Sequence, residues 1–146
     1  MPQHASLWVA DDTYETPSKE WVLDTFPAWY KDYMFKAGLD KWVETNDCDD
    51  KSSLFKGFAQ SAHMAYFYRA LTQSAHSLSV DYLNLSSQSI AIGELWFKVD
   101  DGCTHAVNCA VIKVEQDFQL LIIEPQTCEE LKLSVSELAS VYYVRF

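Results

Sequence analysis

Positively charged side chains are scarce in this sequence, and that scarcity excludes several classes of partner. The 146 residues include 11 Lys and Arg against 21 Asp and Glu, which gives a formal net charge of -10. Because nucleic acids are bound through their phosphates by a basic face, this balance argues against a nucleic-acid partner. It argues equally against an anionic membrane surface, and it favours cationic substrates or metal ions.

The sequence also lacks a recognisable targeting or membrane-spanning segment. Its first residues, MPQHASLWVADDTYE, do not combine a basic start with an apolar run, as a secretory signal would. No apolar stretch approaches the length that a helix needs to cross a bilayer. We therefore expect a cytoplasmic protein, or a protein of the host cytoplasm if the source is viral.

The cysteines form no metal-binding or disulfide pattern. Cys48, Cys103, Cys109 and Cys128 include no CxxC pair, which argues against a zinc ribbon. Apolar residues make up 49% of the chain and aromatic residues 14%, so a core can form without disulfides. Reduced thiols are the better interpretation. We expect no organic cofactor.

The length fits a single domain spanning residues 1–146, with residues 1–16 expected to be an irregular arm. Residues 17–20 are typical of a helix start. Pro27 is then expected to interrupt that helix, and residues 28–37 to form a second one.

The clearest helical pattern follows, from about residue 48 to about residue 76. Either Asn46 or Asp47 can cap its amino-terminal end. The apolar residues at helical spacing are Leu54, Phe55, Phe58, Ala62, Tyr66 and Ala70.

From residue 90 onward, β-branched and aromatic residues predominate. They predict strands at residues 90–99, 105–114, 118–124 and 141–146. Helices followed by strands indicate an α+β fold, with amino-terminal helices and a long central helix packed on a carboxy-terminal antiparallel sheet.

Three side chains on these elements could act together. Cys48 is expected at the amino-terminal end of the long helix, where free N–H groups and the helix dipole stabilise a thiolate. His105 begins a predicted strand after a turn, and Glu124 ends the next strand before Pro125. A thiol, an imidazole and a carboxylate in this order suit nucleophilic catalysis.

Whether His105 meets Glu124 depends on the hairpin between the two strands. If Ile112 pairs with Asp117 around a four-residue loop, paired residue numbers sum to 229 and His105 lies opposite Glu124. A two-residue turn at Gln116-Asp117 gives a sum of 233, which places Glu124 too far along the strand to orient the imidazole. The wider loop would also turn one apolar face toward the long helix: Val107, Cys109, Val111, Phe118, Leu120 and Ile122.

The segments DCDD at a helix start, THAVN at a strand start and IEPQ at a strand end resemble the papain and transglutaminase superfamily. Within that superfamily, the segments resemble the papain-like carboxy-terminal domain of fungal chimeric agglutinins and uncharacterised phage and bacterial proteins. The resemblance covers roughly residues 46–126. It implies a papain-like or transglutaminase-like fold.

The resemblance also implies roles for individual residues. Cys48 would be the nucleophile, His105 the general base and acid, and Glu124 the group that orients the imidazole. Gln126 would lie near the metal or contribute to an oxyanion hole. The wider superfamily has a Gln or Asn before the nucleophile that helps form the oxyanion hole, and this sequence has no obvious counterpart. Asn46 and backbone N–H groups are the only local candidates for that function.

A metal ion is implied as well, because acidic residues beside the cysteine bind calcium or manganese in the agglutinin domain. Asp49 and Asp50 would be the ligands here. Two carboxylates beside Cys48 oppose thiolate formation, since like charges disfavour the ionised form. Bound Ca²⁺ or Mn²⁺ would remove that objection, so a metal-dependent site is the more coherent form.

The function implied by the resemblance is a cysteine hydrolase that cleaves a peptide or isopeptide amide in a peptide or protein substrate. The alternative is a non-catalytic module of the same fold, acting as a viral or bacterial structural or accessory binding protein. Taken singly, Cys48 is also explained as a small half-buried residue at a helix start. His105 taken singly is also explained as a structural, hydrogen-bonding residue. An aromatic cluster fits a core better than a sugar-binding platform, although a carbohydrate site stays an open alternative. The cluster consists of Trp21, Trp29, Tyr30, Tyr33 and Trp42.

Overall fold

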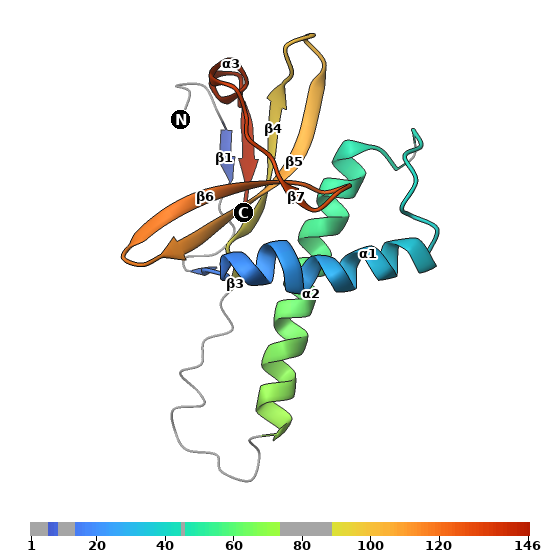
Figure 1. The fold of residues 1–146 in the computed structure, drawn as a ribbon, viewed down its shortest axis with the longest axis vertical. Helices are drawn as coiled ribbons and strands as arrows, with labels where there is room; N and C mark the ends of the chain where they lie inside the picture. Colours follow the sequence, from blue (N-terminus) through green and yellow to red (C-terminus); the bar gives the residue numbers. More distant parts are fainter. Residues whose placement is uncertain (1–5, 9–13, 45, 74–88) are drawn as a thin grey trace.

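The computed structural model describes residues 6–8, 14–44, 46–73 and 89–146, and it confirms the α+β class (Figure 1). The helical elements are a π-helical turn (Trp21–Thr25), α1 (Phe26–Lys36), α2 (Cys48–Gln73) and α3 (Val135–Ala139). The strands are β1 (Ser6–Trp8), β2 (Tyr14–Glu15), β3 (Ser89–Ile90), β4 (Ile92–Lys98), β5 (Thr104–Val114), β6 (Asp117–Glu124), β7 (Glu129–Glu130) and β8 (Tyr143–Arg145).

The strands form one main sheet in the order β1-β8-β4-β5-β6-β7. The five strands from β8 to β7 are antiparallel to their neighbours, whereas β1 runs parallel to β8 at the edge. Figure 1 shows α1 running across α2, and β5 and β6 extending together as a long hairpin. β2 and β3 form a separate parallel pair.

The amino-terminal part differs from the sequence prediction. Residues 1–16 are not irregular throughout, because β1 and β2 lie within them. Both strands pair in parallel with distant segments, and local sequence does not reveal such pairing. Pro27 does not interrupt a helix either: it stands in the first turn of α1, where the missing N–H of proline costs no hydrogen bond.

The sheet has a buried cluster on each face, and the prediction of which face packs on α2 was wrong. The side chains that pack with Phe55 and Ala59 of α2 include Ala110, Ile112, Leu121 and Ile123. The predicted set instead divides: Val107, Cys109 and Ile122 belong to the second cluster, while Phe118 and Leu120 are exposed. β5 is apolar on both faces, so its alternation cannot identify the side that the helix covers.

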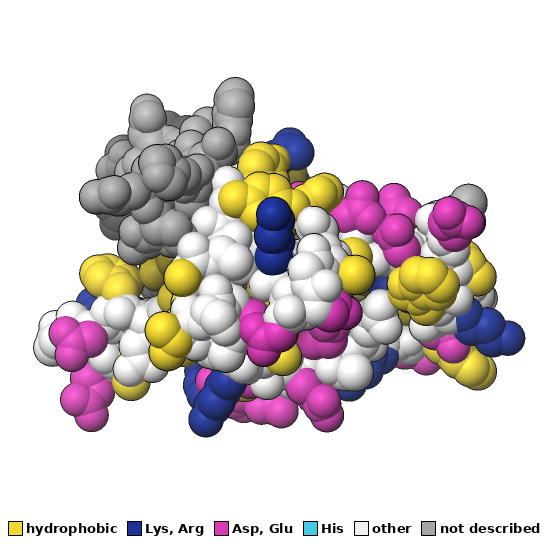
Figure 2. Space-filling model, turned by 90° about the horizontal axis from the view of Figure 1, so that it is seen from above, with side chains coloured by type: hydrophobic (Ala, Val, Ile, Leu, Met, Phe, Trp, Pro, Cys, Tyr) yellow, Lys and Arg dark blue, Asp and Glu magenta, His cyan; other side chains and the backbone are white. Residues whose placement is uncertain are grey.

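The described part of α2 ends at Gln73, and the predicted end near residue 76 lies outside the described residues. Within the described ranges, no helix has the length and apolar character that crossing a membrane requires. Acidic side chains are spread across the face shown in Figure 2, with basic side chains among them.

Candidate functional site

The segment before α2 is fixed by the buried side chain of Asn46. Its Nδ2 donates to the backbone oxygens of Leu39, at 2.9 Å, and Lys41, at 3.3 Å. The backbone N–H of Lys51 donates to Asp47 O at 3.0 Å, which closes the first turn. Asn46 therefore holds the loop that leads into α2 and places Cys48 as its first residue.

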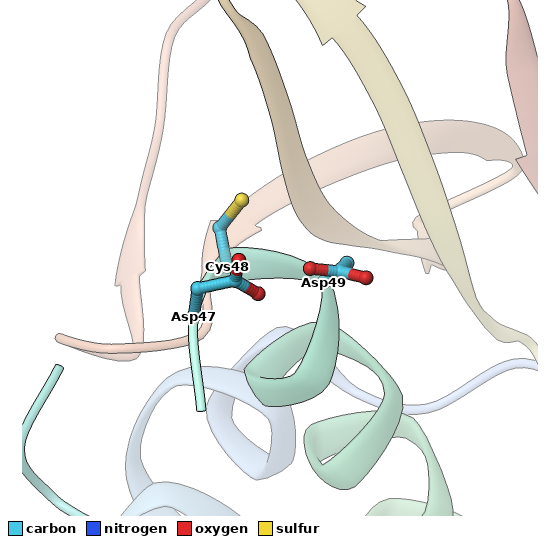
Figure 3. Close-up of side chains that lie close together, drawn as sticks. All are labelled: Asp47, Cys48 and Asp49. Atoms are coloured by element: carbon cyan, nitrogen blue, oxygen red, sulfur yellow. The ribbon is translucent and has the colours of Figure 1, made fainter. Parts of the chain in front are cut away.

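Two carboxylates and the thiol gather at this helix start (Figure 3). Ligand atoms of Asp47, Cys48 and Asp49 all lie within 4.8 Å of one another. A hydrogen bond with Asp47 is the largest of the causes that raise the pKa of the Asp49 carboxyl, followed by desolvation. Asp50 is exposed and stands outside this group, so the structure pairs Asp49 with Asp47 rather than with its expected partner.

The β5–β6 hairpin has neither of the two registers considered from the sequence. Val114 pairs with Asp117 around a two-residue turn in which Glu115 has a φ of 55°, so paired numbers sum to 231. In this register Glu124 falls opposite Val107, one diagonal step from His105 on the same face. Diagonal neighbours are within reach of long side chains, so a tight turn does not separate the pair as expected.

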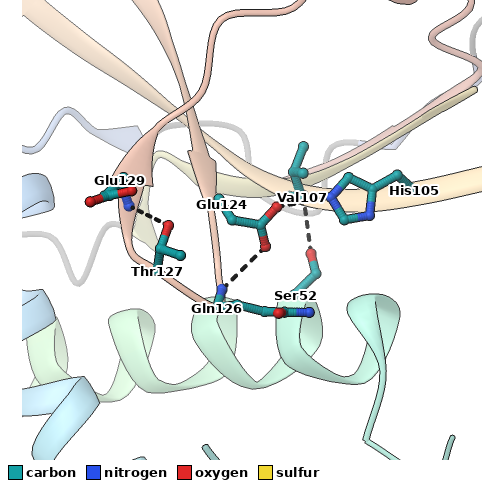
Figure 4. A network of polar contacts seen from close by, with 7 residues as sticks. All are labelled: Ser52, His105, Val107, Glu124, Gln126, Thr127 and Glu129. Carbon is teal, nitrogen blue, oxygen red and sulfur yellow. Dashed lines mark hydrogen bonds and ion pairs between the residues drawn. The ribbon is translucent and has the colours of Figure 1, made fainter. Parts of the chain in front are cut away.

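His105 and Glu124 form the best-defined polar pair of the site (Figure 4). His105 Nε2 lies 2.9 Å from Glu124 Oε2, with 26% and 19% of their side chains exposed. The other carboxylate oxygen of Glu124 accepts from the backbone N–H of Gln126 at 3.2 Å. The ring of Phe97 meets the imidazole edge to face at 5.7 Å. These contacts fix the imidazole, as the sequence predicted for Glu124.

Cys48 and the His105–Glu124 pair come from different elements, α2 and the β5–β6 hairpin. Among the described residues, no hydrogen bond joins the Cys48 sulfur to the His105 ring. A separation of at most about 4 Å between these atoms therefore stays a prediction.

Asn108 is a structural residue whose role the sequence reasoning missed. It is fully buried, and its Nδ2 donates to Ser52 O at 3.0 Å and to Gly93 O at 3.1 Å. Ser52 in turn donates from Oγ to Val107 O at 3.1 Å. These three bonds tie the second turn of α2 to β4 and β5. The sequence signal for this role is the amide side chain of Asn108, which stands among apolar residues in the interior of its strand.

A groove of about 650 Å³ opens beside α2 and combines polar and apolar walls. Its lining residues are Leu39, Asn46, Asp50, Ser53, Leu54, Gly57, Phe58 and Ser61. An aromatic group adjoins it: the ring centroid of Phe58 lies 4.5 Å from that of Tyr33 and 5.6 Å from that of Trp29. Tyr33 and Trp29 are exposed, so only part of the aromatic cluster is core.

No protein-family model matches the sequence, and no curated protein matches it. Solved structures do resemble it. A complex described as PSL1a-E64 superposes with a TM-score of 0.62 at 18% identity, over 100% of this chain and 44% of that one. Polyporus squamosus lectin bound to the epitope Neu5Aca2-6Galb1-4GlcNAc gives 0.57 at 18% identity, over 97% and 42%. The chain shares its fold with part of a lectin.

This comparison corrects the assignment made from the sequence. The placement in the papain and transglutaminase superfamily was wrong, because the structures that share the fold are those of a lectin. The prediction of a cysteine hydrolase acting on a peptide or isopeptide substrate falls with it. Short motifs carried that assignment. Segments of four or five residues such as DCDD, THAVN and IEPQ can mark a helix start, a strand start and a strand end without indicating any chemistry. The chain spans less than half of each lectin chain.

Proposed function

We propose that this chain is a non-catalytic binding module and that its ligand is a glycan held in the groove beside α2. The observation that carries the proposal is the composition of the groove. Asp50, Ser53 and Ser61 offer hydrogen-bonding groups along one helix face. The half-buried ring of Phe58, next to exposed Tyr33, offers an apolar surface. A small number of convergent polar groups on a mostly apolar wall is typical of sites that bind small ligands.

A sugar presents hydroxyl groups around an apolar ring face, which matches this lining. The carboxylate of Asp50 is exposed and can accept from neighbouring hydroxyls. The hydroxyls of Ser53 and Ser61 can donate or accept, although Ser61 Oγ already donates to Gly57 O at 2.8 Å. The fold shared with part of a lectin supports the same ligand class.

Replacing Asp50 by asparagine is expected to weaken glycan binding about ten- to hundredfold, because a hydrogen bond to a charged group contributes about 1.5–3 kcal/mol. The measurement is calorimetric titration with the trisaccharide Neu5Aca2-6Galb1-4GlcNAc, its Galb1-4GlcNAc fragment and a glycan array. Asp117→Asn, a change of another exposed aspartate on the β5–β6 hairpin, is the matched control and should leave affinity unchanged. Absence of binding to every sugar would refute the glycan proposal, and turnover of a peptide amide would refute the non-catalytic one.

We further propose that Cys48, His105 and Glu124, with Asn46 and Gln126 beside them, form a second ligand site that reacts with electrophiles. The PSL1a structure is described as a complex with E64, a thiol-reactive epoxide. Cys48 is partly exposed at the start of α2. The other thiols are protected: burial raises the pKa of Cys109 to about 12 and that of Cys128 to about 11. A hydrogen bond with Asp101 raises the pKa of exposed Cys103.

At neutral pH, iodoacetamide and E64 are expected to modify Cys48 at least about tenfold faster than Cys103. Only the thiolate attacks, and in the proposed site His105 would offset the carboxylates beside Cys48, whereas Asp101 disfavours the Cys103 thiolate. Peptide mapping by mass spectrometry gives both rates in one sample. His105→Ala should slow modification of Cys48 several-fold and leave Cys103 unchanged. Faster labelling of Cys103, or a His105→Ala variant that labels Cys48 normally, would contradict this site.

Calcium or manganese at the helix start is a separate proposal. The Asp47 Oδ1 atom is buried and has no hydrogen-bond partner among the described residues, which suits an oxygen ligand for a hard cation. The Cys48 sulfur points away from both carboxylates in Figure 3, so Asp47 and Asp49 would hold the ion. The ion would offset the repulsion between these two neighbouring carboxylates, which is one of the causes that raise the pKa of Asp49.

Calcium at 100 times its dissociation constant should then stabilise the chain by about 2.7 kcal/mol, seen as a higher melting temperature. Asp47→Asn with Asp49→Asn should abolish this response. Asp50→Asn should keep it, because Asp50 stands outside the group. A response that Asp50→Asn removes would favour the pair Asp49 and Asp50 instead, and equal melting in calcium, manganese and EDTA would exclude the metal.

A further inference from the structure

A small cavity of about 80 Å³ lies where α1, α2 and the turn after β6 meet. Its walls are Tyr30, Lys31 and Met34 of α1, Asp40, Lys51 of α2 and the Pro125–Gln126 turn. By the same measure one water needs about 10–15 Å³, so the space holds a group of several heavy atoms. It is distinct from the groove, with which it shares no lining residue.

The tyrosine in this cavity has an unused donor. Tyr30 is 2% exposed, and its Oη has no hydrogen-bond partner among the described residues. Burial raises the pKa of this phenol well above its usual range, so it stays protonated and able to donate. A buried hydroxyl without a partner costs about 1–3 kcal/mol, which is the desolvation that a bound acceptor would offset.

The lysine in the cavity has a second unused donor. Lys51 is also 2% exposed, and its Nζ donates to Leu39 O at 2.9 Å and more weakly to Asp40 O at 3.4 Å. An ammonium group has three donors, so one remains. Both acceptors are uncharged carbonyls, and no carboxylate of the described residues forms an ion pair with Lys51. Burial lowers the pKa of Lys51, and the charge of Asp40 offsets this only in part.

The charge of the lining differs in sign from that of the chain. Two lysines, Lys31 and Lys51, stand against one carboxylate, Asp40, which gives a formal charge of +1 in a chain whose net charge is -10. Asp40 is exposed, so water screens its repulsion of an anion, whereas Lys51 is shielded from water.

From these observations we propose that the cavity binds a small carboxylate, with Tyr30 Oη and Lys51 Nζ as the donors to its oxygens. A carboxylate can accept from both donors at once, and the small volume of the cavity limits the ligand to a short acid. The site adjoins the His105–Glu124 pair through Gln126, whose backbone N–H donates to Glu124. A ligand in the cavity therefore contacts the turn that positions Glu124.

Acetate is the probe, measured by thermal melting against sodium chloride at equal ionic strength. Acetate should raise the melting temperature saturably by at least about 2 °C beyond chloride, since it binds only the folded chain. In Tyr30→Phe the ring contacts with Phe26 and Phe55 are kept while the unpartnered hydroxyl is removed. This variant should melt at or above the temperature of the unaltered chain without acetate, and its acetate affinity should fall at least about fivefold.

Two further variants keep the test decisive if Tyr30→Phe folds poorly. Lys31→Gln removes one exposed lysine of the lining and should lower acetate affinity two- to threefold. Met34→Leu conserves volume and polarity in the same lining and should respond as the unaltered chain does. Equal melting in acetate and chloride, or an undiminished response in Tyr30→Phe, would show a cavity that holds water only and would overturn the proposal.

Discussion

Replacing Asn108 by alanine is expected to lower the free energy of unfolding by about 2–4 kcal/mol. The substitution removes two hydrogen bonds and leaves the backbone oxygens of Ser52 and Gly93 buried without this donor. Each such group costs about 1–3 kcal/mol in a site that water does not reach. The loss of volume at a fully buried position adds to this cost. Urea unfolding at neutral pH measures the change.

Gln60 provides the matched control for this prediction. It ties α2 to β3 of the separate β2–β3 pair, donating from Nε2 to Ile90 O at 2.9 Å and accepting from Ile90 N at 3.1 Å. Because Gln60 is only partly buried, water can reach the groups that Gln60→Ala exposes, and we expect a loss of about 1–2 kcal/mol. Hydrogen exchange should quicken in the first turns of α2 for Asn108→Ala but not for Gln60→Ala. A loss below about 1 kcal/mol for Asn108→Ala would show that the amide does not hold the helix to the sheet.

The sequence was sufficient to predict the fold class and most elements that carry the site. Helical spacing in residues 48–73 and β-branched residues after residue 90 are local patterns, and local patterns determine type and approximate bounds. Cys48 at a helix start followed from those bounds, whereas the meeting of His105 with Glu124 was expected only for a wider loop that the hairpin does not have. The capping box between Ser134 and Glu137 is also a local pattern, although the helix that it begins, α3, was not predicted.

What could not be predicted depends on contacts between distant segments. The hairpin register follows from a two-residue turn at Glu115 and Gln116, in which Glu115 has a positive φ, and neither alternative considered had that turn. The helix-facing side of β5 depends on α2 and on the buried amide of Asn108, because both faces of this strand are apolar. The groove is lined by Leu39 and by side chains spread over three turns of α2. No sequence motif connects Leu39 with those side chains. The function assigned from short motifs failed for the same reason: the motifs described local geometry.

Gly93→Ala is expected to be the most damaging exchange of a glycine for alanine in the described chain. A Cβ atom at position 93 would lie 2.6 Å from the backbone oxygen of Arg145 and 3.2 Å from the Phe146 ring. A backbone atom cannot rotate out of the way as the end of a flexible side chain can, so β8 must move away from β4. β8 has only three residues, and it also carries β1. We expect a loss of about 2–3 kcal/mol or more in the free energy of unfolding.

The same substitution at Gly57 should have the opposite sign. Gly57 lies in the interior of α2, and a Cβ there would meet nothing within 4 Å. Alanine in a helix interior is more stable than glycine by about 0.5–1 kcal/mol, so Gly57→Ala should raise the urea midpoint while Gly93→Ala lowers it. Amides of residues 143–145 should lose hydrogen-exchange protection in Gly93→Ala alone. Because the Gly93 oxygen accepts from Asn108, the two damaging substitutions should be less than additive when combined. A Gly93→Ala chain that unfolds like the unaltered one would mean that β8 tolerates displacement, and β1 with it.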